Sequence, residues 1–438
     1  MKNGTENNVV IIGAGFTGLS LAYELSKAGV KVLILESSSS IGGLASSFDV
    51  GGEKLDCFYH HWFTSDYSIM NIISELGLND KVLINPTNTG LYYANNFYKM
   101  STPIDVLRFT PLSILNRFRL GLLVLRARSV KKWKSLESLT AVDWLKKLGG
   151  EKVYRIVWEP LIKGKFGPYA DDISAVWFWN KIKLRGGSRG NKGEEKLAYF
   201  KGGFAALADE ILKKIKECGG KIYLDSEVNE VYKEGKLWNI KTRDNKFISK
   251  NVVFTTSLPI ISNLIKSWAS DEYLNNLNKI NYLGNVCLIL ELNQSLSNTY
   301  WTNVNDPSFP FVGLIEHTNF EKSETYGGKH IVYLSKYLSH SDPIFSMDKN
   351  EFFNFSYPFI KKMFPKFNLD WVEDYHIWKS KWSQPVVVKK YSELIPKEIT
   401  PYEGMYICSM AQIYPEDRGT NYAVKYGTLL ASKIIRKL

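Results

Sequence analysis

The chain has 438 residues, 45% hydrophobic and 23% charged, and this composition excludes a largely disordered or fibrous protein. That length predicts two to three domains, or one large domain with a second one elaborated on it. The 56 basic and 44 acidic residues leave a charge of +12, which suits an anionic membrane surface or an anionic small substrate; nucleic acid is not expected, because no nucleic-acid-binding motif accompanies the charge.

The first segment with a readable pattern is residues 8–36, NVVIIGAGFTGLSLAYELSKAGVKVLILE. An apolar run at 9–12 predicts a buried strand, a G-x-G-x-x-G turn follows, and apolar residues then recur at helical spacing. A second apolar run ends in Glu36. Strand, glycine turn, helix and strand in this order predict a dinucleotide site.

Each position of this motif has a physical reason. Gly13 permits the tight turn, Gly15 lets backbone N–H groups approach a pyrophosphate, and Gly18 lets the helix pack closely on the sheet. Glu36 is placed to accept hydrogen bonds from an adenosine ribose. The motif and its neighbours predict these cofactor-binding residues: Gly13, Ala14, Gly15, Phe16, Thr17, Gly18, Glu36 and Ser37.

A second glycine pair, Gly42-Gly43, follows in the stretch SIGGLAS at 40–46. With the first turn it resembles the flavoprotein superfamily of protoporphyrinogen oxidases, flavin amine oxidases, carotenoid desaturases and UDP-galactopyranose mutases. In that superfamily the Gly-Gly backbone runs beside FAD, so the resemblance implies FAD rather than NAD. It adds four residues to the expected cofactor site: Gly42, Gly43, Leu44 and Ala45.

The stretch DCFYHHWFTSD at 56–66 places two of the six histidines side by side. Adjacent residues of a strand point to opposite faces, so the pair is a poor metal site and no metal is expected. UDP-galactopyranose mutases carry a His- and Phe-containing stretch at a similar interval. The resemblance implies that His60 or His61 faces the flavin as a catalytic group while the other packs inward; a structural role for both stays open.

Residues 104–134 contain eight basic residues and one acid. An apolar stripe at helical spacing is formed by Leu115, Phe118, Leu122 and Leu125, and the arginines off this stripe are Arg117, Arg119, Arg126 and Arg128. Such a basic amphipathic helix rests on anionic lipid, or it buries its stripe in the core of a substrate domain. Both alternatives stay open.

Later segments match the superfamily in the expected order. Residues 159–177, EPLIKGKFGPYADDISAVW, resemble the segment that enters its substrate-binding region. A backbone near the position of Val228 holds the adenine in that superfamily. Residues 378–388, WKSKWSQPVVV, resemble the Trp-x-x-x-x-Pro region that closes the substrate domain.

Residues 404–435 read as a strand, a loop and a helix. In the superfamily this last helix points its N-terminus at the flavin, where its dipole favours negative charge on the reduced ring. The resemblance implies a catalytic role for Arg418 and cofactor binding by Asp417, Gly419, Thr420 and Asn421. Basic residues that suit a phosphate or carboxylate near this site are Lys163, Lys165, Arg185, Arg189 and Arg418.

The resemblance implies an α/β fold: a Rossmann-like FAD-binding domain of the glutathione-reductase type with an inserted mixed α+β substrate domain. The FAD-binding domain is expected from three separate segments, residues 1–90, 197–259 and 397–438. The substrate domain is expected from residues 91–196 and 260–396, with the basic amphipathic part at 104–134.

The function that the resemblance implies is an FAD-dependent oxidoreductase that dehydrogenates a small organic substrate such as an amine, a porphyrinogen or a prenoid. Two alternatives remain. One is a redox-neutral flavin enzyme that acts on a nucleotide sugar, as UDP-galactopyranose mutases do. The other is a non-catalytic, membrane-associated flavoprotein.

The four cysteines show neither pairing nor C-x-x-C spacing, as expected for a reduced chain. The sequence has no signal-peptide pattern and no apolar run near the ~18 residues that would span a bilayer. We therefore expect a cytoplasmic protein, and contact with a membrane surface is left open.

Overall fold

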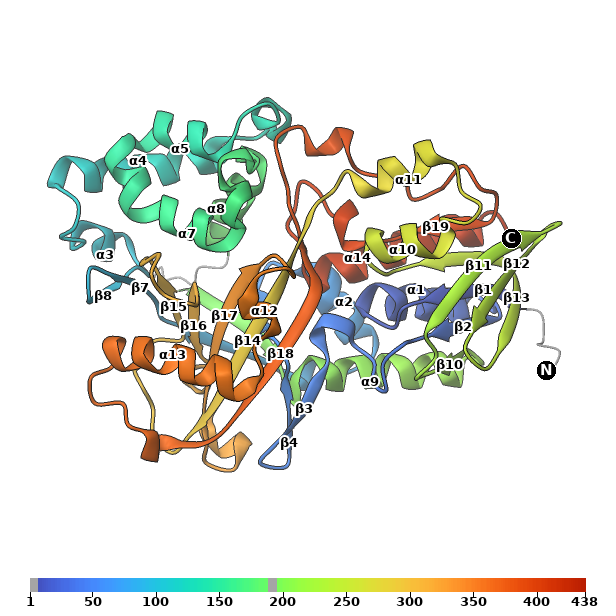
Figure 1. Ribbon diagram of the computed structural model, residues 1–438, viewed down its shortest axis with the longest axis horizontal. Coiled ribbons are helices and arrows are strands. Elements are labelled where there is room, and N and C mark those ends of the chain that lie inside the picture. Colours follow the sequence, from blue (N-terminus) through green and yellow to red (C-terminus); the bar gives the residue numbers. More distant parts are fainter. Residues whose placement is uncertain (1–6, 188–194) are drawn as a thin grey trace.

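A computed structural model describes residues 7–187 and 195–438, and its strands form two large sheets and two small ones (Figure 1). In the first large sheet, five parallel strands run in the order β10-β2-β1-β13-β19, and β11 and β12 extend β13 as an antiparallel meander. The strands are β1 Asn7–Ile12, β2 Val32–Leu35, β10 Lys221–Tyr223, β11 Val228–Glu234, β12 Leu237–Thr242, β13 Lys246–Phe254 and β19 Met405–Ile407.

This parallel sheet joins three distant parts of the chain. Val9 of β1 lies opposite Val32 of β2 on one side and Asn251 of β13 on the other, and Val252 lies opposite Met405 of β19. All of β2 is buried, as is typical of a parallel strand covered on both faces. The sheet and its helices confirm the predicted α/β class.

Helices α1 (Phe16–Lys27), α9 (Gly203–Glu217) and α14 (Thr420–Ile435) pack together beside this sheet. The contact between α1 and α14 is close because α14 has no side chain at Gly427. A Cβ atom there would lie 2.2 Å from the Ser20 Oγ and 2.7 Å from the Thr17 carbonyl oxygen. The first and last helices of the chain are thereby held against each other.

The second large sheet has the order β18-β14-β17-β16-β15-β7-β8. Neighbouring strands of this sheet are antiparallel, except β7 and β15, which run parallel to each other. The strands are β7 Thr89–Tyr93, β8 Asn96–Lys99, β14 Tyr282–Leu292, β15 Trp301–Val304, β16 Gly313–Glu316, β17 His330–Leu338 and β18 Val372–Pro385. Every residue of β14 is buried, which makes this strand the centre of the sheet's core.

The small sheets and the remaining helices complete the fold. The small sheets contain β3 Ser47–Val50 with β4 Glu53–Asp56, and β5 Trp62–Phe63, β9 Glu195–Phe200 and β6 Val82–Thr87. Besides α1, α9, α14 and the helical cluster described below, the helices are α2 Tyr67–Glu75, α10 Leu258–Ile265, α11 Asp271–Asn278, α12 Pro343–Ser346 and α13 Lys349–Met363. Within the described residues we find no helix with the length and apolarity needed to traverse a bilayer.

A cluster of helices forms the end of the molecule farthest from the first sheet (Figure 1). It contains α3 Pro103–Leu107, α4 Ile114–Ser129, α5 Ala141–Gly149, α6 Glu151–Val153, α7 Glu159–Phe166 and α8 Ala175–Gly187. The Thr140 hydroxyl caps α5 by accepting from the Asp143 N–H at 3.1 Å. The apolar stripe of α4 is exposed, with Phe118 62% and Leu125 63% accessible. The alternative in which this stripe forms core is therefore wrong, because α4 packs through its other face.

Candidate functional site

The glycine-rich turn leaves an open approach to the first residues of α1. A Cβ at Gly15 would meet no atom within 4 Å, whereas one at Gly18 would lie 2.0 Å from the Gly13 carbonyl oxygen. Gly15 is the N-cap of α1, and no side chain caps the free N–H groups there. An open space above uncapped N–H groups fits a pyrophosphate. The side chains of Ala14 and Phe16 point into the core, so only their backbones face this space.

The second glycine pair lies directly beside this turn. The Gly42 N–H donates to the Ala14 carbonyl oxygen at 2.9 Å, and Gly42 forms an isolated parallel β-bridge with Gly15. Gly42 and Gly43 have φ values of 104° and 60°, which favour glycine. Ala45 is buried in the core. The structure therefore brings the two glycine segments together, and the roles of Gly42, Gly43 and Ala45 toward a cofactor stay predictions.

A cavity of about 410 Å³ brings together four residues predicted to bind the cofactor: Gly13, Glu36, Ser37 and Val228. The Glu36 carboxylate accepts from the Ala14 N–H at 2.7 Å, the Ser38 N–H at 2.9 Å and the Ser37 hydroxyl at 3.2 Å. A carboxylate has about four acceptor positions, so one remains for a ribose hydroxyl. This cavity fits the adenosine end of a dinucleotide.

A second cavity, of about 400 Å³, lies where four parts of the chain meet: the histidine segment, α7 with α8, the second large sheet and the start of α14. We call it the main cavity. The residues predicted from the sequence that line it are Leu44, His60, His61, Lys165, Arg185, Asp417, Arg418, Gly419, Thr420 and Asn421. Thr17 and Gly18 line neither cavity.

Both histidines line the main cavity, from an irregular segment rather than a strand. The loop backbone does not impose opposite faces on the two side chains, so which of them faces a flavin stays a prediction. The His60 Nδ1–H donates to the Phe58 carbonyl oxygen at 2.6 Å, which leaves Nε2 as an acceptor. The His61 Nδ1 lies 3.1 Å from the Tyr300 hydroxyl. Burial lowers the pKa of His60 to about 4 and that of His61 to about 3, so both imidazoles are neutral at pH 7.

Buried hydrogen bonds fix the histidine segment at both ends. Upstream, the Asp56 carboxylate accepts from the Tyr199 hydroxyl at 2.7 Å and from the Phe204 N–H at 3.1 Å, at the N-terminus of α9. Burial raises the pKa of Asp56 to about 7. Downstream, the Trp62 Nε1–H donates to the Thr420 Oγ1 at 2.7 Å. The histidines are thus held relative to both α9 and α14.

A charged cluster lies at the wall formed by α7 and α8. The Lys181 ammonium lies 2.5 Å from the Asp417 carboxylate. Burial alone would raise the pKa of Asp417, but Lys181, Lys165 and Arg418 hold it well below its usual range. Burial lowers the pKa of Lys165 to about 7, and its ammonium lies 4.9 Å from the Trp177 ring and 5.0 Å from the Tyr337 ring.

Arg418 lines the main cavity but pairs with neutral groups. Its Nε donates to the Gln384 Oε1 at 3.0 Å and its Nη2 to the Tyr337 hydroxyl at 3.0 Å. Among the residues that the structure describes, no carboxylate lies within ion-pair distance of this guanidinium. Arg418 is therefore available to an anionic group in the cavity.

One of the basic residues expected near the cavity, Lys163, does not line it. Lys163 is exposed and pairs with Glu159 at 2.9 Å, one turn earlier on α7. Arg189 lies outside the described residues. Sequence reasoning missed Asp66 and Lys181, which line the cavity. Asp66 ends the histidine stretch, so its place in the sequence could have marked it, whereas Lys181 lies on α8 and reaches the cavity only through packing between distant segments.

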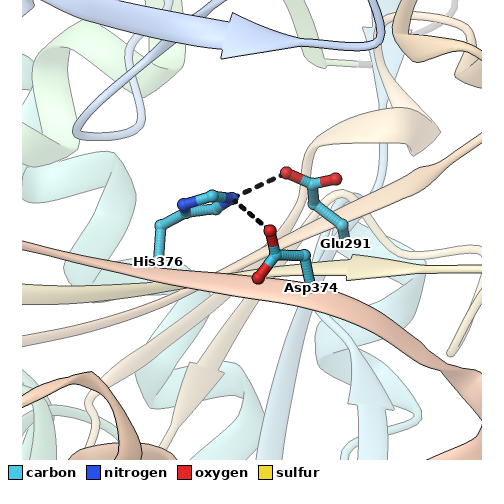
Figure 2. A group of neighbouring side chains, drawn as sticks. All are labelled: Glu291, Asp374 and His376. Atoms are coloured by element: carbon cyan, nitrogen blue, oxygen red, sulfur yellow. Dashed lines mark hydrogen bonds and ion pairs between the residues drawn. The ribbon is translucent and has the colours of Figure 1, made fainter.

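A group of side chains that are common metal ligands lies away from both cavities, on β14 and β18 (Figure 2). The His376 Nε2 lies 2.7 Å from the Glu291 Oε1 and 3.7 Å from the Asp374 Oδ2. The other Glu291 oxygen lies 2.5 Å from the Lys329 ammonium. Because Lys329 already compensates Glu291, we interpret the group as an ion-pair network on the sheet.

Comparison with known proteins adds a family match. The sequence profile of the family described as flavin containing amine oxidoreductase matches residues 16–434. Among curated proteins, the chain is 25% identical over 316 residues to 15-cis-phytoene desaturase of Glycine max, and the match covers 67% of this chain and 55% of that protein. The chain thus spans about half the length of the curated relatives it matches.

Solved structures show the same fold over nearly the whole chain. A candidate protoporphyrinogen oxidase from Exiguobacterium sp. 255-15 superimposes with a TM-score of 0.79 and 14% identity, covering 100% of both chains. Reduced UDP-galactopyranose mutase gives a TM-score of 0.78 and 14% identity, covering 99% of this chain and 95% of that one. At these identities the likeness shows the fold alone.

Proposed function

Because this chain belongs to the flavin containing amine oxidoreductase family, we propose that it is an FAD-dependent oxidoreductase that dehydrogenates a small organic substrate bearing an anionic group. FAD is the cofactor of this chain, as the family match shows. When bound, FAD accepts the hydride that the substrate gives up. The two cavities, one beside the glycine turn and one beside the histidines, suit the two ends of such a cofactor and a substrate.

The proposed FAD contacts follow the geometry of the first cavity and of the two uncapped helix ends. Glu36 would accept from the ribose, and the backbone at Val228 would border the adenine. The N–H groups at the start of α1 would hold the pyrophosphate. The start of α14, where Gly419 has no side-chain cap, would face the flavin ring, and its dipole favours negative charge there.

The histidines supply neutral, partly buried imidazoles to the main cavity. The His60 Nε2 is a free acceptor because its Nδ1–H is bound to the Phe58 carbonyl oxygen. A neutral imidazole with a free lone pair can accept a hydrogen bond from a substrate N–H or O–H group beside the C–H bond that is broken. We assign this role to His60, and we assign His61, which contacts Tyr300, to positioning the substrate.

The excess of positive charge around Asp417, where Lys165, Lys181 and Arg418 surround a single carboxylate, supports an anionic substrate over a protonated amine. The Arg418 guanidinium has only neutral partners among the described residues, while Lys181 is already paired with Asp417. A carboxylate placed against Arg418 gains a charge-assisted hydrogen bond, whereas a protonated amine there meets repulsion. This is the observation that carries the substrate class.

The experiment is an anaerobic reduction assay with the purified, FAD-loaded protein. Candidate amines, prenoids and carboxylated tetrapyrroles are added in turn, and the flavin absorbance near ~450 nm, that of an FAD bound in a dinucleotide fold, is followed. Bleaching by a carboxylated substrate, without added reductant, supports the proposal. If only amines bleach the flavin, the proposed substrate class is wrong, but the assignment as an oxidoreductase stands.

The alternatives predicted from the sequence give different outcomes in the same assay. A redox-neutral enzyme of nucleotide sugars would show turnover only after the flavin is reduced with dithionite. The Arg418 charge also suits a pyrophosphate, so this alternative is kept as the second candidate. A non-catalytic flavoprotein would hold FAD that none of these compounds reduces or turns over.

A further inference from the structure

Helix α4 carries apolar side chains on two opposite faces. Its inner face buries Leu120, Leu123 and Ala127 against the neighbouring helices α5 and α8. At about 100° per residue, Leu125 lies about 180° around the helix from the buried Asn116. An apolar outer face cannot be explained by packing within the chain.

The outer face forms one continuous stripe along the whole helix. It consists of Ile114, Leu115, Phe118, Leu122 and Leu125, of which Ile114 is 68% exposed and the least exposed, Leu122, is 43% exposed. Single exposed apolar side chains are ordinary on protein surfaces, whereas a contiguous group of this kind marks an interaction surface. We call it the α4 stripe.

Helix α3 packs against α4 and adds two more exposed apolar side chains, Ile104 at 59% and Leu107 at 47%. The only acid of this region, Asp105, is half-buried and caps the start of α3, where it accepts from the Ser101 and Thr102 N–H groups. Figure 1 shows both helices at the outer end of the helical cluster. The apolar surface therefore has no negative charge available at its centre.

Arginines lie on both flanks of the α4 stripe. By the same helical geometry, Arg119 and Arg126 lie on one side of it and Arg117 and Arg128 on the other. Within the described ranges, none of the basic residues between 104 and 134 forms an ion pair. An apolar stripe with uncompensated cations along both edges matches a lipid surface, where the apolar groups enter the acyl boundary and the guanidinium groups meet the phosphates.

We propose that the α4 stripe, with α3, seats this protein on an anionic membrane surface, with α4 lying in the plane of the interface. This goes beyond the proposed redox function and does not depend on it. We assign this surface to lipid rather than to a protein partner. A layer of anionic headgroups can contact the arginines on both sides of the stripe at the same time. A protein partner would need acidic residues opposite both rows of arginines.

The test uses the FAD-loaded protein and flotation with vesicles made of equal parts phosphatidylcholine and phosphatidylglycerol. The natural sequence is expected to float with these vesicles and to be released at about 1 M salt, where the screening length is only about 3 Å. It should bind pure phosphatidylcholine vesicles far more weakly. Failure of the natural sequence to bind the anionic vesicles at low salt overturns the proposal.

Two substitution pairs separate the apolar and the charged contributions. Phe118→Asp with Leu125→Asp removes two stripe side chains and should weaken partitioning roughly 100-fold. Its matched control is Leu369→Asp with Ile399→Asp, two exposed apolar positions elsewhere, which should leave binding unchanged. Arg126→Gln with Arg128→Gln should weaken binding about fivefold for each charge removed. Its control is Arg436→Gln with Lys437→Gln at the C-terminus.

Folding of each variant is checked by its FAD content and its unfolding temperature, since all these positions are exposed. Equal loss of binding in a stripe pair and its control overturns the assignment to α4. Size-exclusion chromatography without lipid provides the remaining arm. A dimer that Phe118→Asp with Leu125→Asp converts to monomer, without vesicle binding by the natural sequence, would assign the stripe to self-association instead.

Discussion

The Nε1–H of Trp62 donates to the Oγ1 of Thr420 at 2.7 Å, and this bond joins the histidine segment to the first turn of α14. Trp62 is 1% exposed, so loss of the partner leaves a largely buried N–H without its hydrogen bond. We expect Thr420→Val to lower the free energy of unfolding by about 1–3 kcal/mol. Thr420→Ser keeps the hydroxyl and should remain close to the natural stability. Urea unfolding of the three proteins measures this, and equal losses for Ser and Val would contradict it.

Two glycines of the first turn are expected to have different roles, Gly15 in FAD binding and Gly18 in folding. Gly15→Ala should leave the unfolding midpoint of the FAD-free protein unchanged, because its Cβ meets no atom within 4 Å, and should block the approach of FAD. Gly18→Ala should instead lower the free energy of unfolding by about 3 kcal/mol, because its Cβ would lie 2.0 Å from a backbone oxygen. Fluorescence titration with FAD and thermal unfolding report the two effects. A Gly15→Ala protein that binds FAD normally would refute the pyrophosphate assignment.

His60→Ala should slow flavin reduction by the substrate about 100-fold while FAD stays bound. The expected cause is the loss of the free acceptor nitrogen of a residue that lines the main cavity. Stopped-flow absorbance measures the reduction rate, and the FAD content is read from the same spectra. The control is His340→Ala, an exposed histidine that lines neither cavity. Full reduction rates in both His60→Ala and His61→Ala would make the pair structural.

Arg418→Met should raise KM for an anionic substrate about 10- to 100-fold, with a smaller effect on kcat, because a charge-assisted hydrogen bond to the bound substrate is lost. Arg418→Lys keeps the charge without the planar fork and should give an intermediate KM. Steady-state kinetics with a carboxylated substrate and its neutral ester separate charge from shape. If Arg418→Met raises KM equally for the ester and for the acid, Arg418 does not recognise the negative charge of the substrate.

The lowered pKa values of the two histidines also predict a pH dependence of stability. Burial lowers the pKa of His61 in the folded protein to about 3 from an ordinary value of 6.5. Between these pH values the unfolded chain binds a proton that the folded chain does not, so stability falls as the pH falls from 6.5 toward 3 and is fully present above 6.5. His61→Gln should flatten the unfolding midpoint measured across this window. His340→Gln should leave the slope as it is.

Much of the first sheet could be predicted from local sequence, because the glycine turn and the Glu36 position are dictated by backbone geometry within one short segment. The main cavity could be predicted only in part. Lys181 and Asp417 meet across segments more than 200 residues apart in sequence, and no spacing rule connects them. The α4 helix shows a different limit. Periodicity identified its apolar stripe, but Leu120 and Leu123 make the opposite face apolar as well. The sequence alone therefore does not tell which of the two faces is buried.

The pairing of β1 with β13 and of β13 with β19 sets the order in which this protein can be completed during synthesis. Val252, in the middle of the sheet, has no neighbour on one side until Met405 has left the ribosome. Until then β13 presents an open edge, of the kind that recruits foreign strands. Contacts of such long sequence separation also form slowly. We therefore expect the nascent chain, rather than the finished enzyme, to be the form most in need of a chaperone.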